Sequence, residues 1–180
     1  MLFSSLVPAI FFNATVNLPI VLGPTATGST LTYADLVSGT FVSEPGFTPS
    51  ITGHAIRGGD YITIDPSGAI LRLHLDTLIA TSDTPPQYIR IQASGAEVAT
   101  PDVWDIVTNP ASTRVVKFGD FQATSSWTFS ANSSGKYAEL EKAVYVGSTS
   151  LRGLGKESGG KFQVGFKIAQ VVSVKTGGNV

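Results

Sequence analysis

The chain contains no cysteine, and only 14% of its 180 residues are charged. The absence of cysteine excludes disulfides, thiolate metal sites and thiol catalysis. The two histidines belong to no metal-binding spacing, so we expect no metal. Twelve Lys and Arg residues balance 13 Asp and Glu residues without a basic run, which argues against a nucleic-acid partner.

Motifs for nucleotide and hydrolytic chemistry are also lacking. Residues 155–161 have the GxxxxGK spacing of a phosphate loop, but Phe162 replaces the Ser or Thr that would bind magnesium, and a strand is expected next. No GxSxG elbow is present, so nothing supports a hydrolytic triad. We therefore expect no cofactor.

The apolar N-terminal segment, residues 1–12, is far too short to cross a bilayer and has no basic start typical of a signal peptide. We interpret it as part of the first strand and expect no membrane span. The compartment stays open: a secretory route if a signal peptide was removed, and the cytoplasm otherwise. In a secretory route, the sequons at Asn13 and Asn132 would be glycosylation sites.

The chain is rich in glycine (19), proline (10) and short apolar runs, a composition typical of one compact, turn-rich domain over residues 1–180. Helix is expected only at residues 99–107 and 136–142, and the second window also fits the start of a strand. Sequential strands without βαβ spacing predict an all-β fold, a single antiparallel β-barrel. The expected strands are residues 9–22, 30–41, 50–57, 60–65, 68–80, 87–94, 115–131, 138–148 and 161–175.

A hairpin at residues 68–94 gathers most of the groups suited to chemistry. On its first strand polar residues alternate with Leu71, Leu73 and Leu75, and residues 82–86 form the turn. The expected pairing sets Arg90 near Asp76 and Gln92 near His74. The polar face comprises Arg72, His74, Asp76, Tyr88, Arg90 and Gln92.

Two interpretations of this face stay open. If it lines a cavity, His74, Asp76 and Arg90 are the catalytic candidates, because imidazole titrates near neutrality and the carboxylate can orient it. Arg72, Tyr88 and Gln92 would then bind substrate, and the leucine row on the outside would predict a homodimer interface or a packed helix. If the polar face is the solvated outer face, the leucines pack in the core.

Aromatic residues offer a lining for an apolar ligand. Trp127 and Phe129 share one strand face, Tyr61 lies in another strand, and Trp104 lies in the segment 97–112, which has the character of a loop at a barrel mouth. Plain core packing, and a plain surface loop, explain the same residues. His54 is interpreted as a structural strand histidine.

The order of several short motifs resembles a family of small bacterial and fungal β-barrel proteins long described as being of unknown function. The resemblance spans about residues 9–172. It implies a lipocalin-like barrel of about 8–11 strands with an internal cavity. The motifs are Gly23-Pro24, Ser38-Gly-Thr-Phe41, Gly53, Gly58-Gly59-Asp60-Tyr61, Asp65-Pro-Ser-Gly68, the strand 88–95, and Tyr137 leading to Val144-Tyr-Val-Gly147.

Some fungal members of that family act in natural-product pathways, including hetero-Diels-Alderases of tropolone sesquiterpenoid assembly. The resemblance thus implies a cofactor-free cyclase or pericyclase for a hydrophobic polyketide or terpenoid. Asp76 and Glu139 depart from the bacterial pattern, so a bacterial member's activity does not transfer. The alternatives are a non-catalytic barrel that carries a hydrophobic molecule, and a purely structural homodimer.

Overall fold

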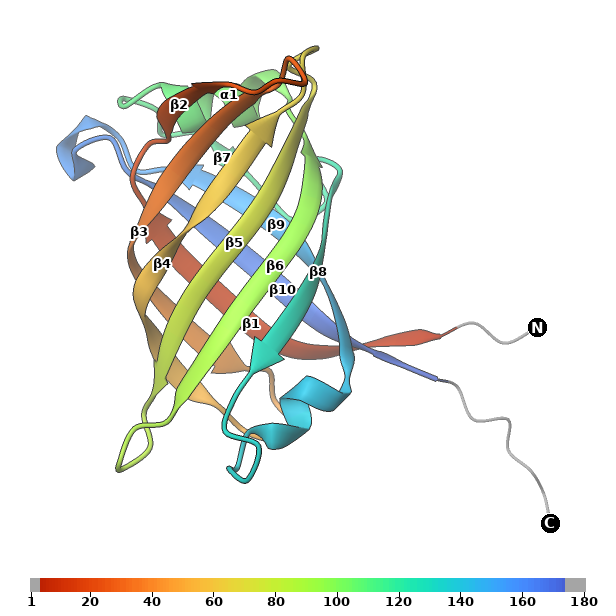
Figure 1. The fold of residues 1–180 in the computed structure, drawn as a ribbon. Helices are drawn as coiled ribbons and strands as arrows, with labels where there is room; N and C mark the ends of the chain where they lie inside the picture. Colours follow the sequence, from red (N-terminus) through yellow and green to blue (C-terminus); the bar gives the residue numbers. More distant parts are fainter. Residues whose placement is uncertain (1–3, 174–180) are drawn as a thin grey trace.

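The computed structural model describes residues 4–173, which form a closed antiparallel β-barrel (Figure 1). Eight strands close the ring in the order β1-β10-β9-β8-β6-β5-β4-β3, and β3 pairs back with β1. Strand β2 extends the sheet beyond β3, and β7 pairs with β9. The predicted all-β barrel is confirmed. The strands are β1 Ser5–Val16, β2 Ile20–Pro24, β3 Thr30–Ser43, β4 Thr52–Ile64, β5 Ile70–Thr81, β6 Tyr88–Val98, β7 Val115–Val116, β8 Ala123–Ser130, β9 Val144–Gly153 and β10 Phe162–Val172.

Short helices lie at both ends of the barrel (Figure 1). Helix α1, Pro101–Thr108, begins at Thr100, whose side chain accepts a hydrogen bond from Val103 N, and it buries one apolar side against the barrel. The 3₁₀ helix η1, Ala138–Lys142, lies at the opposite end and buries Leu140. A second 3₁₀ turn, η2, is Lys156–Ser158. Within residues 4–173, no helix has the length and apolarity needed to cross a bilayer.

The helix expected at residues 99–107 is confirmed, but several strand boundaries differ from expectation. The expected strand 9–22 breaks into β1 and β2 ahead of Pro19, and the expected strand 115–131 is divided between β7 and β8. The expected strands 50–57 and 60–65 are one strand, β4, because the chain continues through Gly58, at φ 150°, and Gly59 instead of turning there.

An irregularity in β4 decides which of its side chains enter the barrel. The pairing of β4 with β5 shifts between Ala55 and Arg57, so one extra residue is inserted. Gly53 and Ala55 are buried before the shift, whereas Asp60 and Ile62 are buried after it. A bulge of this kind reverses the alternation of inner and outer faces, and it turns Asp60 inward and Tyr61 outward.

Aromatic side chains fill the half of the interior nearer η1. Phe129 packs edge-on against Tyr145 with ring centroids 4.7 Å apart, and Trp127 packs edge-on against Phe166 at 5.0 Å. Phe12 and Phe41 extend the same cluster. Smaller aliphatic side chains occupy the half nearer α1, and the interior there is incompletely filled.

Candidate functional site

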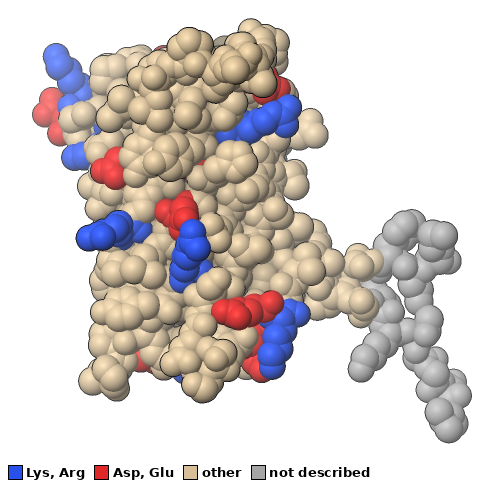
Figure 2. Space-filling view, in the orientation of Figure 1, with Lys and Arg blue, Asp and Glu red and all other residues tan. Residues whose placement is uncertain are grey.

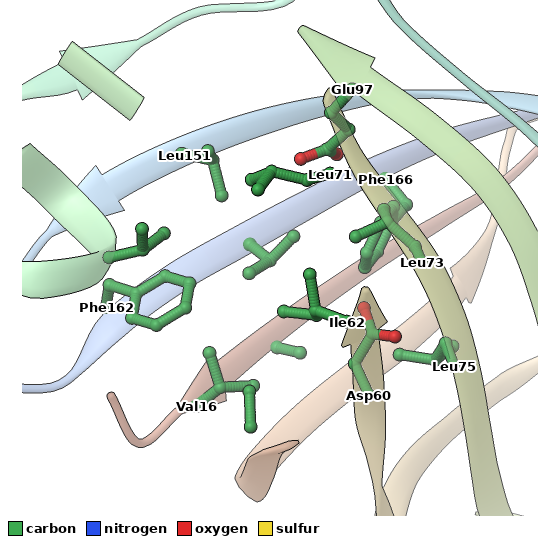
Figure 3. Close-up of a pocket in the computed structure, with 14 residues that line it drawn as sticks. Val16, Asp60, Ile62, Leu71, Leu73, Leu75, Glu97, Leu151, Phe162 and Phe166 are labelled. Atoms are coloured by element: carbon green, nitrogen blue, oxygen red, sulfur yellow. The ribbon is translucent and has the colours of Figure 1, made fainter. Parts of the chain in front are cut away.

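A narrow chamber lies inside the α1 half of the barrel and contains two carboxyl groups (Figure 3). Its volume is about 40 Å³, and at roughly 10–15 Å³ for each water-sized group it holds only about three such groups. Asp60 and Glu97 are the ionisable residues of the described chain that line it. The other twelve are apolar: Ala14, Val16, Ala34, Ile62, Leu71, Leu73, Leu75, Val107, Leu151, Phe162, Val164 and Phe166.

Asp60 reaches the chamber from β4. Its Oδ1 accepts a hydrogen bond from the backbone N–H of His74 at 2.8 Å, which fixes the carboxyl against the neighbouring strand β5. Burial raises the pKa of Asp60 to about 7; the hydrogen bond from His74 lowers it in part, and the charge of Glu97 adds to the rise.

Glu97 reaches the chamber from the end of β6, on the far side of β5. Its Oε1 is buried and has no hydrogen-bond partner among residues 4–173. Burial raises the pKa of Glu97 to about 7, and interaction with the Thr149 hydroxyl lowers it in part. A buried carboxyl oxygen without a partner is costly to keep in a folded protein and is typical of a functional group.

The two carboxyls line the same chamber, but they do not form a hydrogen-bonded dyad. Asp60 is paired across the sheet with Leu75, and Glu97 with Leu71, so the inward leucines of β5 separate them. Their charges still interact, because the pKa of Asp60 responds to Glu97. Near neutral pH each group is present both as acid and as carboxylate, so the chamber can donate or accept a proton in apolar surroundings.

A wider vestibule adjoins the chamber at the α1 end of the barrel. It has a volume of about 320 Å³ and shares Ile62, Leu71 and Val107 with the chamber. The half-buried side chain of Trp104 lies on its wall, together with Thr32 and the aliphatic residues of the β2 end. This placement fits the expectation that the segment 97–112 shapes a barrel mouth and that Trp104 contacts a ligand. No Lys, Arg or His in the described part of the chain lines either cavity.

The polar hairpin face lies on the outside of the barrel, which decides between the two interpretations of the sequence. Leu71, Leu73 and Leu75 are buried, whereas Arg72 and His74 are exposed. The catalytic candidates His74, Asp76 and Arg90 therefore cannot contact a ligand in the interior, nor can Arg72, Tyr88 and Gln92. The dimer expectation based on an outward leucine row also loses its basis.

The outer face is occupied by ordinary surface contacts. Arg90 forms a bidentate pair with Asp76, Gln92 also donates to Asp76, and Arg72 pairs with Asp65. Hydrogen bonding from Arg90 lowers the pKa of Asp76. Ser94, not Gln92, is the cross-strand neighbour of His74. Figure 2 shows the same pattern on one face of the molecule, with blue side chains next to red ones.

The remaining predicted residues divide between the surface and the core. Tyr61 is 50% exposed and contacts Tyr33 on the outer wall, with ring centroids 4.8 Å apart. Trp127 and Phe129 are buried in the aromatic cluster and line neither cavity, as plain core packing predicts. Asn13 lies half-buried within β1, and Asn132 lies in the turn after β8, where its Oδ1 accepts a hydrogen bond from Ser134 N. Glycosylation at either residue stays a prediction.

Sequence reasoning missed Asp60 and Glu97, although the sequence carries a signal for both. Glu97 has the same parity as Ile89, Ile91 and Ala93, so the alternation of β6 places a carboxyl on its apolar face. Asp60 likewise has the same parity as Ile62 and Ile64, so the three share one face of β4. A lone acidic residue on an apolar strand face is therefore a better signal here than a cluster of polar residues.

Comparisons with solved structures show the same fold. A protein of unknown function from Rhodopseudomonas palustris is 16% identical, with a TM-score of 0.73, and the match covers 96% of this chain and 100% of the other. A β-barrel-like protein from Acinetobacter baumannii is 20% identical, with a TM-score of 0.64, over 94% and 96% of the two chains. A protein described as an enzyme, from Penicillium herquei, is 16% identical, with a TM-score of 0.56, over 93% and 94%.

No curated protein sequence matches the chain. A family model described as "Protein of unknown function (DUF3237)" matches residues 4–171, which is nearly the whole chain and agrees with the barrel geometry. The chain therefore belongs to the DUF3237 family.

Proposed function

We propose that this protein is a cofactor-free enzyme that binds a neutral, hydrophobic small molecule in the vestibule and acts on its polar end with Asp60 and Glu97. The observation that carries the proposal is the pair of buried carboxyls in an otherwise apolar chamber, one of them with an unpartnered oxygen. The description of the Penicillium herquei neighbour as an enzyme is consistent with it.

The chamber and the vestibule differ in size and would bind different parts of the ligand. The chamber accepts only a small polar end, whereas the vestibule holds an apolar body against Trp104. Anionic ligands are disfavoured, because two acidic groups and no cationic side chain face the bound molecule. A neutral terpenoid or polyketide meets both requirements.

The reaction type proposed is a cyclisation of the hetero-Diels-Alder class. Protonated Glu97 donates a hydrogen bond to a carbonyl oxygen of the substrate, which makes the conjugated carbon atoms more electrophilic. The apolar walls hold the reacting carbons together, and Asp60 supplies a second group that can donate or accept a proton. Such a cyclisation loses no atoms and needs no oxidant or metal.

The experiment uses citronellal, a neutral monoterpenoid aldehyde. Its ring closure to isopulegol is a carbonyl-ene cyclisation, which shares with the hetero-Diels-Alder reaction the activation of a carbonyl by a hydrogen-bond donor and likewise loses no atoms. We expect turnover above the buffer background that falls as pH rises through about 7, because the acid forms of Asp60 and Glu97 disappear. Glu97→Gln and Asp60→Asn should lower turnover, whereas the outer-face control variants His74→Asn and Arg90→Ala should not. Turnover that ignores the carboxyl variants contradicts the proposal.

The second candidate is a carrier that binds the same class of ligand without changing it, and the apolar vestibule of about 320 Å³ favours it. Binding of citronellal, followed by quenching of tryptophan fluorescence, separates the two. A carrier gives saturable binding without isopulegol, and Trp104→Ala weakens that binding. Absence of both binding and turnover contradicts the enzyme and the carrier for this ligand class.

A further inference from the structure

The terminal ribbon, residues 5–8 of β1 paired with residues 169–172 of β10, extends from the side of the barrel (Figure 1). In β1, pairing with β3 begins only at Ile10, opposite Ser43. Within residues 4–173, residues 5–8 therefore pair with β10 alone, on one side, and all four are exposed. An edge segment of this kind invites pairing or packing with another chain.

Apolar side chains lie in a row on this ribbon. Leu6 is paired directly with Val171, and Val171 with Val144, so the three side chains share one face across β1, β10 and β9. Leu6 is 60% exposed and Val144 65% exposed. Exposed aliphatic side chains in such a row are stabilised when another layer covers them.

A groove of about 520 Å³ lies at the base of the ribbon, lined by Leu6 and Pro8 together with residues of β8, β9 and β10. One cation and one anion, Lys167 and Glu44, line this groove. No charged residue precedes Asp35 in the chain, so β1 itself is uncharged. Two identical surfaces of this composition can meet without like-charge repulsion.

We propose that the terminal ribbon is a dimerisation element, covered by a second copy of this chain that packs its own ribbon reciprocally about a two-fold axis. A two-fold contact is self-complementary, so the row of one copy packs against the groove of the other, and the reverse. Pro8 lacks an N–H and limits strand pairing along the edge, so side-chain packing dominates the contact. The second copy shields Leu6 and Val144 from water.

The cysteine-free chain allows a direct test by single-cysteine cross-linking. Leu6→Cys places the thiol in the row, and Ile20→Cys is the matched control, because Ile20 is 63% exposed but lies on β2, away from the ribbon. With a flexible bis-maleimide at low protein concentration, we expect covalent dimers from Leu6→Cys and almost none from Ile20→Cys. Equal cross-linking of the two variants overturns the proposal.

Light scattering after size-exclusion chromatography gives the second measurement. We expect the unmodified protein to be a dimer, and Leu6→Asp to weaken association by more than about tenfold, because each dimer loses two buried leucines and gains two charges. Ile20→Asp should leave association unchanged. A protein that stays monomeric at high micromolar concentration overturns the proposal. If Leu6→Asp does not fold, the cross-linking result decides.

Discussion

The most direct test of the buried carboxyls is the pH dependence of folding stability in the variant Glu97→Gln. Glutamine keeps nearly the same shape as glutamate but does not ionise. The pKa of Glu97 is about 7 in the folded protein, against 4.5 as the ordinary value of the residue. The folded state binds the proton of Glu97 more tightly than the unfolded state does. The free energy of unfolding therefore falls as pH rises from about 4.5 to about 7, and Glu97 stabilises the fold least at high pH.

The size of the effect follows from those two pKa values. Between pH 5 and pH 8 the unmodified protein should lose roughly 2 kcal/mol or more of unfolding free energy through Glu97 alone, because the unfolded chain gains the full benefit of ionisation and the folded chain does not. Glu97→Gln removes this loss. The stability of the variant relative to the unmodified protein should therefore rise by a similar amount across that range, whatever its stability at pH 5.

Urea unfolding followed by tryptophan fluorescence at pH 5, 6, 7 and 8 measures this difference. The control variant is Glu157→Gln, which makes the same substitution at an exposed residue of η2. If the stabilities of Glu97→Gln and the unmodified protein change in parallel with pH, the Glu97 carboxyl does not have a raised pKa, and the acid–base argument for the chamber fails.

Three further predictions concern the wall, the mouth and the outside of the barrel. Gly58→Ala should destabilise the protein by roughly 3 kcal/mol in urea unfolding, because φ is 150° there and a Cβ would meet the Asp76 carbonyl oxygen; Gly68→Ala, at φ 70° with open space around it, is the milder control. Trp104→Ala should weaken citronellal binding by about tenfold through loss of aromatic contact, measured by equilibrium dialysis, and an unchanged affinity would show that the ligand binds elsewhere. His74→Asn and Arg90→Ala should leave citronellal binding unchanged, since both side chains lie outside, and a clear loss would refute that placement.

The fold was predictable because a strand with one buried face shows a two-residue alternation of apolar and polar residues in the sequence. The alternation of Leu71, Leu73 and Leu75 with polar residues identifies β5, and the turn at residues 82–86 identifies its partner β6. Barrel closure follows from the number of strands and the lack of crossover helices. The break ahead of Pro19 and the continuation through Gly58 depend on tertiary pairing, so the sequence alone placed these boundaries wrongly.

The site was harder to predict, because alternation shows that two faces exist but not which one is inside. In β5 the apolar face is buried, as in most barrels filled by side chains, and the conspicuous polar face is solvated. In β4 the bulge between Ala55 and Arg57 reverses the alternation, and only the register with β5 reveals it. Trp104 lies on the vestibule wall because the end of a barrel is where a long connection meets the cavity, and its contact with a ligand stays a prediction.

The energetics of Asp60 and Glu97 also bear on function. Ionisation of each carboxyl lowers stability as pH rises from its ordinary pKa to about 7, and no cationic side chain of the described residues lines the chamber, so an amide at either position would serve folding better at neutral pH. Ionisable residues that reduce stability in this way are typical of sites where activity opposes stability. If Glu97→Gln gains stability at pH 8 and loses citronellal turnover, the same carboxyl both destabilises the fold and acts in the reaction. If Glu97→Gln instead gains stability and keeps full turnover, Glu97 has no role in the reaction, and Asp60 is the acid in the chamber.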